Sequence, residues 1–300
     1  MGTVPSDGGA ALGQGAFPPL SGVRHRFADV AGLPVHVAEA GEGEPVVLLH
    51  GFPQHWWEWR HVIPALSSQY RVICPDLRGA GWTGAPAGGY DRERLVADLL
   101  GVLDALGVRR ARLIGHDYGA VLGWLLCLEH PERVHSYLSL SVPHPWIRFH
   151  PAMLGQMWRL WFQGVIVTPG VGPWALRTWL TRYLLRSYAA VPGTFTEDDL
   201  EVFCSRLRER DRARAGSALY RGFILPEARR IVSGAYRDAR VDVPVTVLLG
   251  ARDPGVRVEF LAGWEGHADR LRIVTAEGAS HFVADERPDV VVAEAVELFR

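Results

Sequence analysis

One short segment restricts the fold of this chain more than any other. Residues 111–115 predict a buried strand, which ends in the sequence Gly-His-Asp-Tyr-Gly and continues directly into an apolar helical pattern. Two glycines around a sharp strand-to-helix turn are typical of a nucleophile elbow, which holds its central residue, here Asp117, in strained backbone geometry at one edge of a sheet. The segment has a second interpretation, because aspartate is also a favoured N-cap residue.

The rest of the chain helps to decide between the nucleophile elbow and the N-cap, because its sequence predicts alternating strands and helices. We expect strands at residues 24–30, 34–39, 45–50, 70–74, 111–115, 134–142, 243–249 and 271–275. We expect helices at 56–66, 91–106, from the elbow to about residue 130, at 258–267 and at 288–300. This alternation predicts an α/β fold, in which helices cover both faces of a mostly parallel sheet.

Residues 143–238 differ from the rest, since they show helical patterns, many aromatic side chains and no convincing buried strand. We interpret them as a helical cap inserted between two strands of a core that comprises residues 21–142 and 239–300. Most of the aromatic side chains should pack inside the cap, and some should face a substrate. Residues 1–20, rich in glycine, proline and alanine, predict a disordered leader.

Composition excludes several classes of function. The net charge of −1 gives no basic surplus for nucleic acid, and the chain contains no lysine, so catalysis by lysine is excluded. No apolar run is long enough to span a bilayer, and the N-terminus lacks the features of a secretory signal. Three scattered cysteines fit a reducing cytoplasm, and no residues show metal-ligand spacing. We expect a cytoplasmic monomer or homodimer with no cofactor, no metal, and no nucleic-acid or membrane partner.

Four groups follow predicted strands and should meet at the carboxyl edge of the sheet: the segment His50-Gly51-Phe52, then Asp117, Asp253 and His281. The chain order nucleophile, acid, histidine resembles that of the α/β-hydrolase superfamily, and the resemblance covers residues 21–300. Within this superfamily the chain is most similar to the epoxide hydrolases, which use an aspartate nucleophile. The matching segments are residues 50–53 with Trp57, Trp59 and Arg60, then 75–79, 115–117, 250–253 and 278–282.

The resemblance implies a two-step reaction that suits an aspartate at the elbow. A carboxylate is already anionic at neutral pH, so Asp117 needs no base to displace an oxygen at a saturated carbon. The resulting alkyl ester lies beside the backbone N–H groups of Phe52 and Tyr118, which we expect to form the oxyanion hole. His281, oriented by Asp253, then activates the water that cleaves the ester to release a vicinal diol.

Ring opening also needs an acid at the leaving oxygen, which in this family is usually a pair of tyrosines from the cap. Tyr220 matches the second of these, whereas Trp161 stands where the first tyrosine is usual, so we expect Tyr220 to act with Trp161 assisting. An indole N–H donates a hydrogen bond but does not transfer a proton as a phenol does. Tyr183 and Tyr188 are the fallback partners. The other expected substrate-binding residues are His50, Pro53, Trp146, Tyr183 and Phe282.

Several alternatives stay open at this point. Asp253 could cap a turn before Pro254 instead of orienting a histidine. The aromatic cap suggests a bulky apolar or aromatic epoxide as substrate. A haloalkane-type dehalogenase is the enzymatic alternative, although Tyr118 and Phe52 replace the usual halide-holding tryptophan and asparagine. A relative that binds a ligand without turnover is the non-enzymatic alternative, because fold alone does not determine function.

Overall fold

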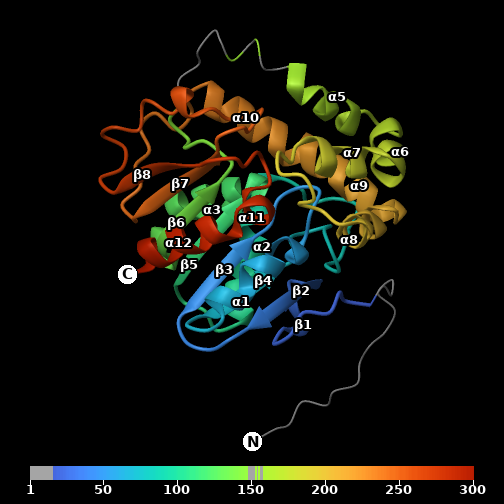
Figure 1. Ribbon diagram of the computed structural model, residues 1–300, viewed down its shortest axis with the longest axis horizontal. Helices are drawn as coiled ribbons and strands as arrows, with labels where there is room; N and C mark the ends of the chain where they lie inside the picture. The colour runs from blue at the N-terminus through green and yellow to red at the C-terminus, as the bar shows by residue number, and fades with distance from the viewer. Residues whose placement is uncertain (1–15, 148–152, 154, 156–157) are drawn as a thin grey trace, which may run out of the picture.

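A computed structural model describes residues 16–147, 153, 155 and 158–300 of the protein (Figure 1). The expected disordered leader therefore lies mostly outside the described residues. The strands are β1 (Arg24–Val30), β2 (Leu33–Ala40), β3 (Pro45–Leu49), β4 (Arg71–Pro75), β5 (Ala111–His116), β6 (Val134–Leu140), β7 (Val245–Gly250) and β8 (Leu271–Ala276). Within the described residues they form one sheet of eight strands in the order β1-β2-β4-β3-β5-β6-β7-β8.

The sheet is mostly parallel, as predicted from the sequence. The pairs β1–β2 and β2–β4 are antiparallel, and the remaining neighbours from β4 to β8 are parallel. Successive side chains of a strand point to opposite faces, so Leu113 packs in the core on one face and Ile114 in the core on the other. A strand that is apolar on both faces must be covered on both, which explains the continuous apolar runs in the sequence.

Helices cover both faces of this sheet. On one side lie α2 (Arg92–Ala105) and α3 (Asp117–Glu129), whose apolar residues join Leu113 in its core. On the other side lie α1 (Ile63–Leu66) and α12 (Pro288–Phe299). The short elements η1 (Trp56–His61), η2 (Pro131–Arg133), η6 (Val258–Phe260) and α11 (Val283–Glu286) complete this part of the chain. Asp91 caps the N-terminus of α2, since its side chain accepts a hydrogen bond from the Arg94 backbone N–H at 3.0 Å.

Two of the expected helices differ in the structure. The helix expected at 258–267 is only the short turn η6, because Gly263 and Gly266 adopt φ angles of 106° and 86°, which a helix does not allow. The helix expected at 56–66 divides into η1 and α1. Pro64 has no backbone N–H to donate to the preceding turn, which explains the division.

A group of helices, here called the inserted helices, lies between β6 and β7 in the chain and above the sheet in Figure 1. They are η4 (Trp158–Leu160), α5 (Trp161–Val167), α6 (Val171–Thr178), α7 (Leu180–Ser187), α8 (Glu197–Leu207), α9 (Arg210–Leu219), the π-helical turn η5 (Tyr220–Ile224) and α10 (Leu225–Val232). They have an apolar core of their own, which includes Phe162, Leu184 and Tyr220. None of the described helices is long and apolar enough to cross a membrane.

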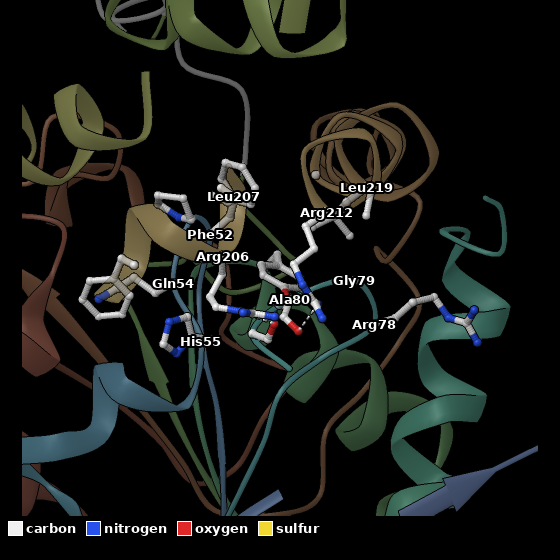
Figure 2. Close-up of a pocket in the computed structure, with 16 residues that line it drawn as sticks. Phe52, Gln54, His55, Arg78, Gly79, Ala80, Arg206, Leu207, Arg212 and Leu219 are labelled. Carbon is white, nitrogen blue, oxygen red and sulfur yellow. Dashed lines mark hydrogen bonds between the residues drawn. The ribbon is translucent and has the colours of Figure 1, made fainter. Parts of the chain in front are cut away.

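Two arginines connect the inserted helices to the loop that follows β4. Arg206 donates to the Gly81 carbonyl oxygen at 3.1 Å, and Arg212 donates to the Thr83 carbonyl oxygen at 2.6 Å. Figure 2 shows both side chains reaching towards Ala80, whereas Arg78 points away from them. These contacts fix α8 and α9 against the loop that follows β4.

Candidate active site

The elbow places Asp117 where strand β5 turns into helix α3. Asp117 has a φ angle of 49°, in the left-handed region that non-glycine residues rarely adopt. The turn is tight enough to require its glycines, because a Cβ on Gly115 would lie 2.8 Å from the Gly119 carbonyl oxygen. A Cβ on Gly119 would lie 2.5 Å from the carbonyl oxygens of Leu49 and His50. The backbone therefore presents the Asp117 carboxylate at the carboxyl edge of the sheet.

Asp117, His281 and Asp253 lie together in the structure. Nδ1 of His281 is 3.0 Å from Oδ2 of Asp253, and Nε2 of His281 is 3.7 Å from Oδ2 of Asp117. The His281 backbone N–H donates to the Tyr188 carbonyl oxygen at 3.2 Å, which fixes the loop that carries the ring. Asp253 also accepts hydrogen bonds from the backbone N–H groups of Gly255 and Val256, so it shapes a turn as well as contacting the imidazole.

The charged forms of Asp117 and His281 stabilise each other. Burial alone would raise the pKa of Asp117, but the neighbouring imidazole of His281 outweighs burial and lowers that pKa to about 2. Burial alone would lower the pKa of His281, but the charges of Asp253 and Asp117 raise that pKa to about 10. In the free enzyme at neutral pH, Asp117 is therefore an anion and His281 an imidazolium.

One of the expected oxyanion donors already contacts Asp117. The Phe52 backbone N–H donates to Oδ1 of Asp117 at 2.9 Å. Tyr118 stands in the first turn of α3, where backbone N–H groups have no intrahelical acceptor. Its role as the second donor stays a prediction.

A cavity of about 350 Å³ opens above Asp117. It is lined by eight of the residues expected at the site, namely Phe52, Pro53, Asp117, Tyr118, Tyr220, Asp253, His281 and Phe282. Tyr220, at the start of the π-helical turn, is almost fully buried, and its ring packs against Phe52 at 5.1 Å between centroids. Burial and then the charge of Asp117 raise the pKa of Tyr220 well above its ordinary value, so the phenol keeps its proton at neutral pH.

Four of the expected substrate-binding residues do not line this cavity. Trp161 is 40% exposed and stacks on Trp179 at 6.2 Å between ring centroids, and Tyr183 packs edge-on against both. The register of α5 explains this, because the next residue, Phe162, lines the cavity instead of Trp161. Of the two fallback tyrosines, Tyr188 lines the cavity and Tyr183 does not.

The other two expected substrate-binding residues that do not line the cavity, His50 and Trp146, are buried structural residues. His50 is fully buried, and its Nε2 accepts a hydrogen bond from the Leu77 backbone N–H at 2.9 Å, which fixes the loop after β4. Trp146 packs on Trp124, and its indole N–H donates to the Ala239 carbonyl oxygen at 3.1 Å. Neither side chain is available to a substrate.

The sequence interpretation missed three polar residues that support the site. Ser141 donates to the His281 carbonyl oxygen at 2.7 Å, and Nε2 of His116 lies 2.9 Å from the same oxygen. Glu58 accepts a hydrogen bond from the Gly51 backbone N–H at 2.8 Å. His116, next to the nucleophile, was visible in the motif, whereas nothing in the sequence connected Glu58 or Ser141 to it.

A second, much smaller cavity of about 20 Å³ is shown in Figure 2, and its lining includes Phe52, Pro53 and Tyr118, which also line the larger cavity. It has room for about one water molecule, so it does not accommodate a substrate. Among the described residues, no group of three or more histidine, cysteine or carboxylate side chains has the arrangement of a metal site. The larger cavity is therefore the candidate active site.

Comparisons with known proteins find relatives along most of this chain. The α/β hydrolase fold family matches residues 44–288. The chain is 31% identical to Epoxide hydrolase 2 of Siraitia grosvenorii, in an alignment that covers 89% of this chain and 95% of the relative. The solved structure of the epoxide hydrolase CorEH superposes with a TM-score of 0.78 at 27% identity, over 92% of this chain and 98% of that one. The structure of Cfl2 from Burkholderia cenocepacia gives a TM-score of 0.83 at 28% identity, over 95% and 98% of the two chains.

Proposed function

The chain belongs to the α/β hydrolase fold family and, within it, to the epoxide hydrolases, and we propose that it converts an epoxide to a vicinal diol through an ester on Asp117. The observation that carries this proposal is the arrangement of Asp117 and His281 under one apolar cavity, with Asp253 on the far side of the imidazole. The inserted helices then act as the cap that covers the substrate.

In the first step a carboxylate oxygen of Asp117 attacks an epoxide carbon, and the bond from that carbon to the epoxide oxygen breaks. The departing oxygen takes the phenolic proton of Tyr220, which lines the same cavity. Tyr188 is the other cavity-lining phenol of the inserted helices and is a candidate second donor; its hydroxyl donates to the Arg159 carbonyl oxygen in the free enzyme. This assignment replaces Trp161, whose indole lies outside the cavity.

The ester changes the charges around His281. Asp117 becomes neutral, so the imidazole loses one of the two anions that raise its pKa in the free enzyme. Burial raises the pKa of the Tyr220 phenol, so the phenolate left after ring opening is a strong base. A proton therefore passes from the imidazolium to the phenolate through solvent, which leaves His281 neutral and ready to act as a base.

In the second step His281 takes a proton from water, and the hydroxide attacks the ester carbonyl carbon of Asp117. The Phe52 backbone N–H stabilises the negative charge that develops on the carbonyl oxygen. The tetrahedral intermediate collapses, the alkoxide leaves as the diol after taking the proton of the added hydroxyl, and Asp117 returns as an anion beside an imidazolium. Epoxide and water are thus consumed in equal amounts.

The lining of the cavity supports a bulky apolar or aromatic epoxide. Apolar side chains form most of its wall: Val121, Val142, Ile147, Phe162, Leu184, Ile224, Ile231, Val232, Phe260, Leu261 and Phe282. Arg257 is the one arginine among the described lining residues, and Glu259 pairs with it at 3.1 Å. We place the reaction in the cytoplasm, with epoxide and water as the only partners of a monomer or homodimer.

Trapping the ester tests this function. In a His281→Gln variant, alkylation should continue while hydrolysis falls by about 10²–10⁴-fold, so the ester accumulates. Intact-mass measurement after incubation with styrene oxide and with polycyclic epoxides should show the mass of one epoxide on Asp117. Asp117→Asn is the matched control and should show no adduct. Ligand binding without an adduct or diol would favour a non-catalytic role, and halide release from haloalkanes alone would favour a dehalogenase.

A further inference from the structure

The helix that carries Tyr220 changes its hydrogen-bond pattern at that residue. The elements α9, η5 and α10 follow one another without a gap in the chain, and Tyr220 is the first residue of the π-helical turn η5. The Leu225 backbone N–H donates to the Tyr220 carbonyl oxygen, five residues earlier, whereas an α-helix joins residues four apart. A single π turn within an α-helix is frequently found at a functional site.

Pro226 explains why the helix widens at this point. It lies in the first turn of α10, and in an unbroken α-helix its nitrogen would face the Gly222 carbonyl oxygen, four residues earlier. Proline has no N–H to donate to that oxygen, and its ring would clash with the carbonyl group. A wider turn separates the two groups. The local sequence therefore favours a π turn that begins at Tyr220.

Gly222 allows this turn to approach the segment before α2 closely. A Cβ at position 222 would lie 2.5 Å from the carbonyl oxygen of Tyr90, a buried residue. Any larger residue at position 222 would therefore push the π turn away from Tyr90. The glycine at this position sets how deeply the turn sits against the rest of the protein.

Two neighbours of Tyr220 in the chain connect the turn to α5. The Arg221 guanidinium donates to the Val167 carbonyl oxygen at 3.1 Å, and the Ser217 hydroxyl donates to the Ile166 carbonyl oxygen at 2.6 Å. Both carbonyl groups belong to the last turn of α5, where no intrahelical N–H is available to them. The π turn is therefore held by contacts with α5 as well as with Tyr90.

The wider turn also keeps one row of residues towards the active site. Gly216 lies against the Phe52 ring, and Tyr220 packs on the same ring. Ile224 and Ala228, the next residues in steps of four, line the large cavity. In an α-helix each step of four overshoots a full turn by about 40°, so three steps would rotate the last residue by about 120° from the first. A π turn takes more residues per turn and reduces this rotation.

We propose that Pro226 and Gly222 are positioning residues for the acid of ring opening. Pro226 opens the π turn, Gly222 seats it on Tyr90, and the turn directs the Tyr220 hydroxyl towards the epoxide oxygen above Asp117. The inference rests on the proposed function, in which Tyr220 protonates that oxygen. Neither Pro226 nor Gly222 is among the described residues that line the cavity, so both act through Tyr220.

The variant Pro226→Ala tests the first of these roles. Alanine supplies an N–H that can donate to the Gly222 carbonyl oxygen, so the π turn should tighten towards an α-helix and rotate Tyr220. Ester formation is measured by rapid quench and intact mass in the His281→Gln background, where the ester accumulates. Its rate should fall by about 10- to 100-fold. Resistance to urea should be unchanged or higher, because proline is unfavourable inside a helix.

The variant Gly222→Ala tests the second role. Its Cβ should move the turn away from the Tyr90 carbonyl oxygen, and ester formation should slow to a similar extent. Two matched controls should form the ester at the rate of the His281→Gln parent. Gly164→Ala adds a methyl group where there is open space, and Pro173→Ala changes a proline in the first turn of α6, where an N–H has no intrahelical acceptor. If Gly222→Ala does not fold, Pro226→Ala decides alone.

A double variant separates positioning from a merely structural effect. If Pro226 acts through the Tyr220 hydroxyl, adding Pro226→Ala to Tyr220→Phe should cause no further loss of rate, because the group that it positions is already absent. Equal slowing by Pro226→Ala with and without the hydroxyl would overturn the inference. Parent rates in both Pro226→Ala and Gly222→Ala would overturn it as well. Absence of an ester in the His281→Gln parent itself would instead overturn the proposed function.

Discussion

The imidazole of His281 stands 3.7 Å from the Asp117 carboxylate, too far for a hydrogen bond but close enough for an ion pair. Its other nitrogen is 3.0 Å from Asp253. The ring therefore lies between two carboxylates, and in the proposed ester it would lie beside the Asp253 carboxylate alone. On this mechanism the charge on His281 should follow the state of Asp117, which would couple the two steps of the proposed reaction.

This coupling predicts the effect of Asp117→Asn. The amide has nearly the shape of the carboxylate and the neutral charge of the ester, so the pKa of His281 should fall from about 10 towards its ordinary value. Nitrogen-15 or proton NMR titration of the imidazole measures the change, with intact mass to verify that the amide persists. An unchanged His281 pKa would show that Asp117 does not control the protonation of the ring.

The rates of the two steps, alkylation of Asp117 and hydrolysis of the ester, should also depend differently on pH. Asp117, whose pKa is lowered to about 2, is anionic throughout the neutral and mildly acidic range, so alkylation should show no acid limb there. Ester hydrolysis needs neutral His281, so its rate should fall by about tenfold per pH unit below the pKa of the ester form. Single-turnover measurements across pH separate the two. An acid limb on alkylation alone would contradict this assignment of roles.

Tyr220→Phe should impair ring opening specifically. The variant keeps the ring that packs against Phe52 and loses only the proton donor, so alkylation should slow by about 10²–10⁴-fold. Single-turnover ester formation measures this. Tyr183→Phe, on the outer side of α7, is the matched control and should change little. Equal effects of the two substitutions would exclude Tyr220 as the acid.

The tight elbow predicts that alanine substitutions at two glycines, one in the elbow and one outside it, change the stability of the protein in opposite directions. A Cβ at position 119 would lie 2.5 Å from backbone oxygens, so Gly119→Ala should lower the free energy of unfolding by about 1–3 kcal/mol. Gly164, inside α5, has open space around it, and Gly164→Ala should raise that free energy by about 0.4–1 kcal/mol. Urea denaturation measures both. Gly119→Ala with wild-type stability would mean that the turn is looser than described.

The sequence predicted most of the fold, and it predicted that Asp117, Asp253 and His281 meet at one edge of the sheet, where the structure places them together. Strands buried on both faces appear as continuous apolar runs, and the turn around Asp117 needs glycines at fixed positions, so both leave a local pattern. The helix expected at 258–267 was wrong because two glycines with positive φ outweighed the apolar spacing.

The sequence could not show which side of an inserted helix faces the cavity. Trp161 and Phe162 are adjacent aromatic residues, and only tertiary packing determines that Phe162 lines the cavity while Trp161 stacks on Trp179. Glu58 and Ser141 were missed for a related reason, because their partners, Gly51 and the His281 carbonyl oxygen, come together only in the folded chain.

The origin of the oxygen added to the diol tests the central claim most directly. In a single turnover in oxygen-18 water, with enzyme in excess over an epoxide that it hydrolyses, the ester mechanism predicts heavy oxygen in the Asp117 carboxylate and ordinary oxygen in the diol, as read by peptide and product mass. Heavy oxygen in the diol and none on Asp117 in that first turnover would mean that water attacks the epoxide directly, and would contradict the ester mechanism.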